Sequence, residues 1–219
     1  MLNPVENDEV RGEPRKGPRL VYGFDPLCGW CYGFVPAMRA LRERRPDLPI
    51  TLALGGLVTG ERVGPYHLME GYIRGASQRL EAVTGRAPSQ TFFDLITRPD
   101  TIGSSVEPSI VIQSVIDHEP EAALAFAHDV IEAHFTDGAD LNDRTLYATL
   151  FERHGIDRPV PSLSENTAAI HRRFAETRSI GIDSFPTLLV VRDGRTLRLP
   201  TTYDGDELAE LVDRARNVA

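Results

Sequence analysis

The chain contains only two cysteines, Cys28 and Cys31, and they are separated by Gly29 and Trp30. An apolar run, residues 20–24, comes just before this motif, and a helical pattern follows it. A C-x-x-C motif between a strand and a helix is typical of thiol–disulfide chemistry. The start of a helix supplies unpaired N–H groups and a partial positive charge, which favour the reactive thiolate form. The motif therefore predicts a reactive dithiol in the first turn of a helix.

The residues around the cysteines predict a β-α-β unit. Residues 20–24 form a short apolar run that is typical of a buried strand. Apolar side chains recur at helical spacing over residues 32–45, and Pro36 should kink that helix. Residues 50–54 alternate in polarity and predict a second strand, which ends at the glycines 55–56.

The rest of the chain predicts a helical segment followed by a β-β-α unit. Residues 61–178 carry apolar stripes at helical spacing, one of them ending at a glycine helix stop. Residues 186–191 predict a strand that starts at a proline, because proline within a central strand would lose a hydrogen bond. The Asp-Gly pair 193–194 predicts a hairpin turn into a strand over 195–199. A last helix should begin near residue 204.

This order of elements resembles the thioredoxin fold with a large helical insertion, as in the DsbA-like family. The matching residues are Cys28-Gly29-Trp30-Cys31, Pro36, Phe185-Pro186-Thr187 and Asp193-Gly194. The string of residues 25–33 is similar to the cytoplasmic branch of predicted DsbA-type protein-disulfide isomerases. The resemblance implies an α/β thioredoxin-fold domain over residues 19–60 and 179–219, with an inserted helical domain over residues 61–178.

The resemblance also implies which residues meet the substrate. Pro186 should follow a cis peptide bond and lie beside the cysteines, leaving the backbone of Phe185 open to an extended substrate. Gly29, Trp30, Phe185 and Pro186 are therefore the expected substrate-binding residues. The lone tryptophan could equally be a partly buried aromatic that covers the fold.

One position departs from the family pattern. Many thioredoxin-fold enzymes carry a buried acid six residues before the first cysteine, and this chain has Tyr22 there. Asp25 is nearer to the cysteines, but it lies in the turn and could act as a polar or capping group only. The group that handles the proton of Cys31 is left open by the sequence.

The two cysteines have different expected roles. Cys28, at the start of the helix, should be exposed and attack as a thiolate, whereas Cys31, inside the first turn, should be shielded and resolve the mixed disulfide. The chain is thus expected to be a thiol–disulfide oxidoreductase of the disulfide isomerase or oxidase type. Its substrates would be protein or small thiols, with glutathione as a candidate substrate or reductant. No metal and no cofactor beyond the redox-active disulfide is expected.

Composition narrows the setting in which this chemistry would occur. The chain has 24 basic and 32 acidic residues among 219, and its net charge of −8 argues against nucleic-acid binding. No apolar run approaches the roughly 20 residues that a membrane helix needs. Residues 1–18, rich in proline, glycine and charge, predict a flexible arm and no secretory signal. A cytoplasmic enzyme is expected, with pairing into a homodimer as a further expectation.

Three alternatives remain open at this stage. A glutathione-dependent isomerase or transferase could use the same fold, although such enzymes commonly use a single Ser or Cys. A metal-binding module could use Cys28 and Cys31 as half of a zinc site. The spacing of the six histidines, including the six positions from His128 to His134, does not identify the two further ligands that such a site needs. In the third alternative, the cysteines sense oxidation and the helical segment binds a partner.

Overall fold

The structure is a computed structural model that describes residues 17–218, and residues 1–16 and 219 lie outside the described residues. Most of the predicted flexible arm, residues 1–18, therefore falls outside it. The thioredoxin-like part consists of β1 (Arg19–Phe24), α1 (Gly29–Arg44), β2 (Ile50–Leu54), β5 (Thr187–Arg192), β6 (Arg195–Arg198) and α8 (Gly205–Val218). The β-α-β and β-β-α units predicted from the sequence are both confirmed.

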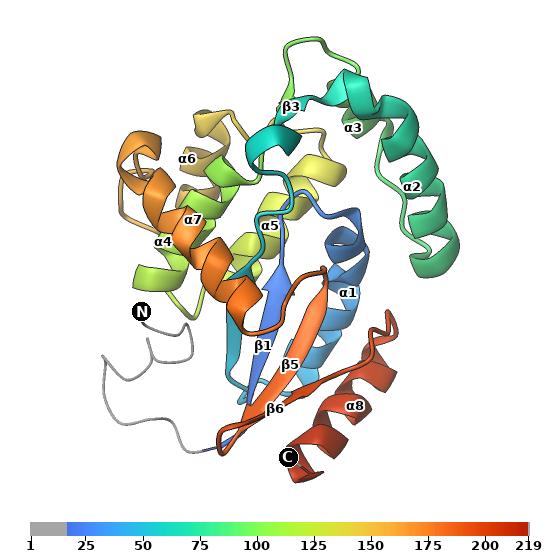
Figure 1. Ribbon diagram of the computed structural model, residues 1–219, viewed down its shortest axis with the longest axis vertical. Helices are drawn as coiled ribbons and strands as arrows, with labels where there is room; N and C mark the ends of the chain where they lie inside the picture. The colour runs from blue at the N-terminus through green and yellow to red at the C-terminus, as the bar shows by residue number, and fades with distance from the viewer. Residues whose placement is uncertain (1–16, 219) are drawn as a thin grey trace.

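These strands form one sheet in the order β2-β1-β5-β6 (Figure 1). β1 is parallel to β2 and antiparallel to β5, so the first strand lies in the centre of the sheet. β5 begins directly after Pro186, as the missing N–H of proline requires. The hairpin between β5 and β6 turns at Asp193 and Gly194, which have φ values of 48° and 75°.

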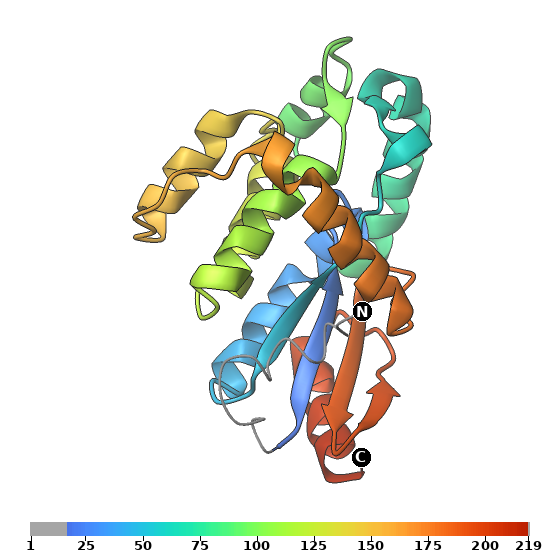
Figure 2. The ribbon, with the colours of Figure 1, turned by 60° about the vertical axis from the view of Figure 1, so that its left-hand side comes forward.

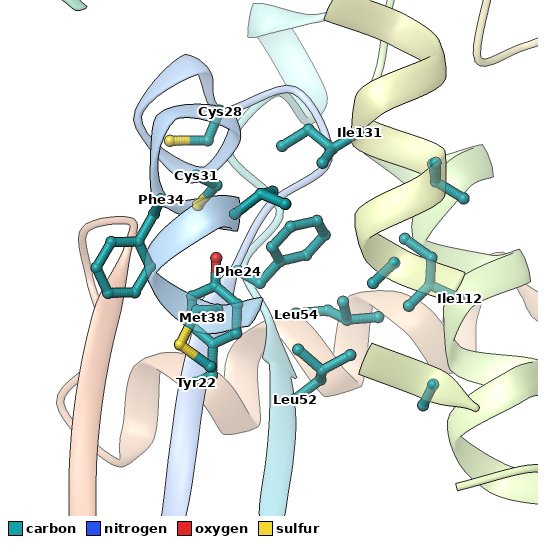
Figure 3. Close-up of a cluster of buried hydrophobic side chains, with 14 of the residues drawn as sticks. Tyr22, Phe24, Cys28, Cys31, Phe34, Met38, Leu52, Leu54, Ile112 and Ile131 are labelled. Atoms are coloured by element: carbon teal, nitrogen blue, oxygen red, sulfur yellow. The ribbon is translucent and has the colours of Figure 1, made fainter. Parts of the chain in front are cut away.

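Alternation along β1 gives the sheet two different faces. Leu20, Tyr22 and Phe24 belong to the main core together with residues of α1 and α8. Val21 points the other way and packs in a smaller cluster with Ile182, which follows α7 (Leu163–Ser179). Figure 3 shows the main core beneath the cysteines. The site therefore rests on buried apolar side chains of the central strand.

The segment between β2 and β5, which we call the helical block (residues 60–179), lies beyond the end of the sheet where β1 leads into α1 (Figure 2). Besides α7 it contains η2 (Gly60–Arg62), β3 (Gly64–Pro65), η3 (Tyr66–Met69), α2 (Glu70–Thr84), α3 (Gln90–Ile96), β4 (Ile102–Gly103), α4 (Val106–His118), α5 (Ala123–Phe135) and α6 (Arg144–Arg153). β3 and β4 pair as a short ribbon that the helical prediction missed, because two-residue strands leave no periodic pattern.

The apolar stripe predicted on α2 is only partly buried. Leu80 is buried, but Tyr72 and Val83 are exposed at 67% and 60%. The reason is that α2 packs on α1 along one face and leaves much of its remaining surface exposed. A side-chain carbon added at Gly33 of α1 would lie 2.8 Å from Leu80. Gly85 ends α2 in the left-handed conformation, with φ 70°, as predicted.

α1 begins at Gly29, three residues before the predicted start, and continues through Pro36. A proline inside a helix leaves the carbonyl four residues earlier without its N–H donor. That carbonyl belongs to Tyr32, and it accepts a hydrogen bond from the Arg86 guanidinium at 2.8 Å. The same guanidinium binds Glu132 of α5 at 2.8 Å and stacks 3.8 Å from the centre of the Tyr32 ring. An arginine of the helical block thus completes the hydrogen bonding of the helix that carries the cysteines.

Candidate active site

Cys28 lies at the N-cap of α1, with extended backbone angles. Its carbonyl accepts the first helical hydrogen bond, from the N–H of Tyr32 at 3.0 Å. Its thiol makes no capping hydrogen bond within the described chain and instead donates to the carbonyl oxygen of Phe185 at 3.3 Å. The first turn of α1 therefore places the Cys28 sulfur against a backbone segment 157 residues away in sequence.

The Phe185–Pro186 peptide bond is cis, and the segment lies beside the cysteines, as the resemblance implied. Pro186 is buried and Phe185 is half-buried. The Phe185 ring lies against Gly55, where an added side-chain carbon would come 2.1 Å from the ring. The paired glycines after β2 thus have a role that the sequence did not predict, because Gly55 leaves room for the residue that faces Cys28. Gly56 has φ 66°, and a side-chain carbon added there would lie 2.5 Å from the Phe174 ring of α7.

Both thiols are free and buried, with 4% exposure for Cys28 and none for Cys31. The prediction that Cys28 is exposed is therefore wrong, although Cys31 is indeed the more shielded of the two. Cys28 is covered because the Phe185 backbone lies over its thiol, and Leu80 and Phe135 of the helical block lie close to neighbouring Gly29. Burial raises the pKa of Cys31 well above its usual range, and the adjacent Cys28 raises it further.

Comparison with known proteins points to one kind of fold. Cytosolic disulfide reductase DsbM from Pseudomonas aeruginosa superposes with a TM-score of 0.77 and 25% identity, over 92% of this chain and all of that one. The catalytic domain of Proteus mirabilis ScsC superposes with a TM-score of 0.54 and 14% identity, over 99% of both chains. The chain has the thioredoxin fold of DsbA-like proteins. The placement of the two cysteines and the likeness to a disulfide reductase both indicate thiol–disulfide oxidoreductase chemistry.

A structure of DsbM with GSH also superposes on this chain, with a TM-score of 0.71 and 22% identity, over 91% of this chain and all of that one. In sequence, the chain is 24% identical to the ClpXP adapter protein SpxH of Halalkalibacterium halodurans over 85% of its own length. It spans 62% of the length of that curated relative. No family model matches the chain.

Asp25 anchors the cysteine loop to the helical block. Its fully buried carboxylate accepts hydrogen bonds from the Leu27 N–H at 2.9 Å, the Leu57 N–H at 2.7 Å and the Ser105 hydroxyl at 2.9 Å. Burial nevertheless raises the pKa of Asp25 above its usual value, because the cost of desolvation exceeds the gain from the hydrogen bonds. Ser105 is 80 residues from Asp25 in sequence, so no local pattern could have identified the pair.

Aromatic side chains cover the other side of the cysteines. Trp30 and Gly29 are half-buried, and the Trp30 ring packs 6.2 Å from the ring of Tyr203. Tyr203 precedes α8, and its pKa is raised by burial and by the two cysteine sulfurs. Sequence analysis missed this residue, and its only signal was an aromatic just before a helix start. Trp30 thus packs on the fold, and whether it also contacts substrate remains a prediction.

Other features of the described residues do not add to the site. No cluster of three His, Cys, Asp or Glu residues suited to a metal ion occurs among residues 17–218, so the cysteines have no further ligands for a zinc site. A cavity of about 780 Å³ lies near Arg39, Arg42 and His128, and none of the predicted site residues lines it. No helix in the described part of the chain has the length and apolar content needed to cross a bilayer.

Proposed function

We propose that this chain is a cytoplasmic thiol–disulfide oxidoreductase in which Cys28 is the nucleophile and Cys31 is the resolving thiol. The observation that carries the proposal is the Cys28 sulfur at the N-cap of α1, 3.3 Å from the Phe185 carbonyl. A helix start favours negative charge on sulfur, and an extended backbone beside it is suited to hold a substrate segment. Cys31 has no exposed surface, which suits a thiol that reacts only within the protein.

The reaction proceeds in two exchanges. The Cys28 thiolate attacks one sulfur of a substrate disulfide, forming a mixed disulfide and releasing the other sulfur as a thiolate. Cys31, after losing its proton to solvent, attacks the Cys28 sulfur, forming the Cys28–Cys31 bond and releasing the second substrate thiolate. The substrate gains two electrons, both released thiolates take protons from water, and the enzyme becomes oxidised. A reducing thiol reverses both exchanges to restore the enzyme.

The expected substrate-contacting residues are Gly29, Trp30, Phe185 and Pro186. The Phe185 backbone would pair with an extended peptide or a small thiol, and the half-buried Gly29 and Trp30 would form the opposite side. The solved structure of DsbM with GSH supports a small thiol such as glutathione as substrate or reductant. The description of DsbM as a cytosolic reductase supports both the compartment and the reducing direction.

The test is a pair of single substitutions, Cys28→Ser and Cys31→Ser, assayed for reduction of insulin. We expect Cys28→Ser to lower turnover to the uncatalysed rate, because no thiolate remains at the helix start. Cys31→Ser is the matched control, since it keeps the nucleophile and should accumulate a mixed disulfide at Cys28 that mass spectrometry detects. Full turnover by Cys28→Ser would overturn the proposal.

A glutathione-dependent isomerase or transferase is the second candidate, and it draws its support from the same DsbM structure with GSH. Such an enzyme would need one thiol only, so Cys31→Ser would keep its main activity. Loss of multiple turnover in that variant would exclude this candidate. The equilibrium of the dithiol with glutathione then gives the direction, because a potential below the cytoplasmic poise indicates a reductase. Homodimer formation remains a prediction, which sedimentation equilibrium would test.

A further inference from the structure

Tyr22 lies on the central strand directly beneath the cysteines and is fully buried. Its ring packs against Phe24 and Phe34, with ring centres 5.6 Å and 5.8 Å away, and its position is therefore fixed. Figure 3 shows its hydroxyl oxygen pointing toward the sulfur of Cys31. In the reduced structure this hydroxyl has no hydrogen-bond partner among residues 17–218.

An unpartnered buried hydroxyl needs an explanation, because it costs about 1–3 kcal/mol of desolvation. Other buried tyrosines of this chain avoid that cost. Tyr147 donates its hydroxyl proton to the Leu141 carbonyl, and the hydroxyl of Tyr66 lies 3.1 Å from Nε2 of His134. Tyr22 is thus an exception, located where the chemistry requires charge to form.

Charge must form on Cys31 in either direction of the exchange. Cys31 attacks as a thiolate when the mixed disulfide resolves, and it leaves as a thiolate when an incoming thiol attacks Cys28. The backbone of Asp25 forms a hydrogen bond that lowers the pKa of Cys31, but the Asp25 side chain does not help. Asp25 already accepts three hydrogen bonds, and its negative charge raises the pKa of Cys31.

Tyr22 keeps its proton under these conditions. Burial, followed by the charges of Cys31 and Cys28, raises the pKa of Tyr22 well above its usual value. The other titratable groups near its side chain are Tyr203, which is itself held protonated by burial, and His128, whose pKa burial lowers to about 3. The imidazole is therefore neutral at pH 7. Tyr22 is thus a neutral donor whose hydroxyl faces the sulfur that becomes charged.

We infer that the Tyr22 hydroxyl is a catalytic hydrogen-bond donor to the Cys31 thiolate. This inference rests on the proposed function, and it gives Tyr22 a role at the position where many thioredoxin-fold enzymes carry a buried acid. The donor makes and breaks no covalent bond. It stabilises the sulfur while the Cys28–Cys31 bond forms or breaks, and the proton of Cys31 itself still goes to solvent.

The test uses Tyr22→Phe, which removes one oxygen and keeps the ring. In a Cys28→Ser background Cys31 is the only cysteine, so the ultraviolet absorbance of its thiolate reports its titration directly. We expect Tyr22→Phe to raise the pKa of Cys31 by about one unit, because a hydrogen bond to a charged group is lost. In the chain with both cysteines, reduction of the Cys28–Cys31 disulfide by excess glutathione should slow about tenfold.

Tyr147→Phe is the matched control, since it also removes the hydroxyl of a buried tyrosine, but one that lies in the helical block, on α6. It should leave both measurements unchanged. Site-specific 3-fluorotyrosine at position 22, a stronger donor, should lower the pKa of Cys31 and covers the case that Tyr22→Phe misfolds. An unchanged or lowered pKa of Cys31 in Tyr22→Phe, or no lowering with fluorotyrosine, would overturn the inference. The titration needs no turnover, so it stays informative even if the proposed function fails.

Discussion

The sheet with α1 and the helical block contribute different things to the site. The cysteines, Tyr22 and the Phe185–Pro186 segment all belong to the sheet, to α1 or to their connections. The helical block contributes no sulfur, but it holds the site in place through side chains such as Ser105. Reactive atoms and the groups that position them thus come from separate stretches of sequence. A change in the block should therefore affect the site through stability and placement.

Three attachments between the two regions near the cysteines differ in kind. Asp25 binds the Ser105 hydroxyl, Arg86 binds the Tyr32 carbonyl, and Leu80 packs against Gly33. The first two are buried or half-buried polar contacts, which cost more when broken than an exposed pair does. Removing the two polar contacts in turn measures how strongly each of them stabilises the folded chain.

Asp25→Ala should have the largest effect on stability. It leaves the N–H groups of Leu27 and Leu57 and the Ser105 hydroxyl without their acceptor, so the free energy of unfolding should fall by about 2–3 kcal/mol. Urea denaturation measures the change. Asp143→Ala is the control, because that exposed carboxylate also accepts a backbone N–H, and its loss should cost only about 1 kcal/mol. Equal losses in the two variants would contradict the anchoring role of Asp25.

Acid should weaken the helical block through two buried histidines. Burial lowers the pKa of His128 to about 3 and that of His134 to about 4, so the unfolded chain binds their protons first as pH falls below about 6.5. Stability should fall by at most about 1.4 kcal/mol per pH unit for each histidine, down to pH values near 4. Asp25 works in the opposite direction, because its raised pKa lets the folded chain take up a proton before the unfolded chain does.

Free energies of unfolding, measured at several pH values between 7 and 4.5, test this prediction. Two single-histidine variants provide the comparison. His134→Gln should reduce the slope, and His118→Gln should leave it unchanged, because His118 is exposed on α4. A slope that does not respond to His134→Gln would show that other groups control the acid sensitivity.

Arg86→Lys should have the smallest of the three predicted effects on the free energy of unfolding. Lysine cannot reach the Tyr32 carbonyl and Glu132 together or stack as a planar group, so stability should fall by about 1 kcal/mol. Arg214→Lys is the control, since its exposed pair with Glu210 on α8 should contribute less than about 0.5 kcal/mol. The two losses, compared by urea denaturation, should differ in that order.

The comparison also explains what the sequence could predict. The strands, the cysteine motif and the Phe185–Pro186 segment carry local signals, namely short apolar or alternating runs, a C-x-x-C spacing and a proline at a strand start. Ser105 and Arg86 carry no such signal, and Tyr203 carries only its place before a helix start, because each acquires its role from a partner far away in sequence. The burial of Cys28 was mispredicted for the same reason, since a backbone segment 157 residues away covers it.

The hydrogen bond from the Cys28 thiol to Phe185 exists only while the sulfur carries hydrogen. Once Cys28 is joined to another sulfur, that carbonyl has lost its partner and is free for the N–H of a visiting chain. In the dithiol state the Phe185 carbonyl therefore accepts a hydrogen bond from the protein itself, whereas in the oxidised state it has no such donor. This one backbone oxygen would thus make the affinity for a bound peptide depend on whether the cysteine pair is reduced or oxidised.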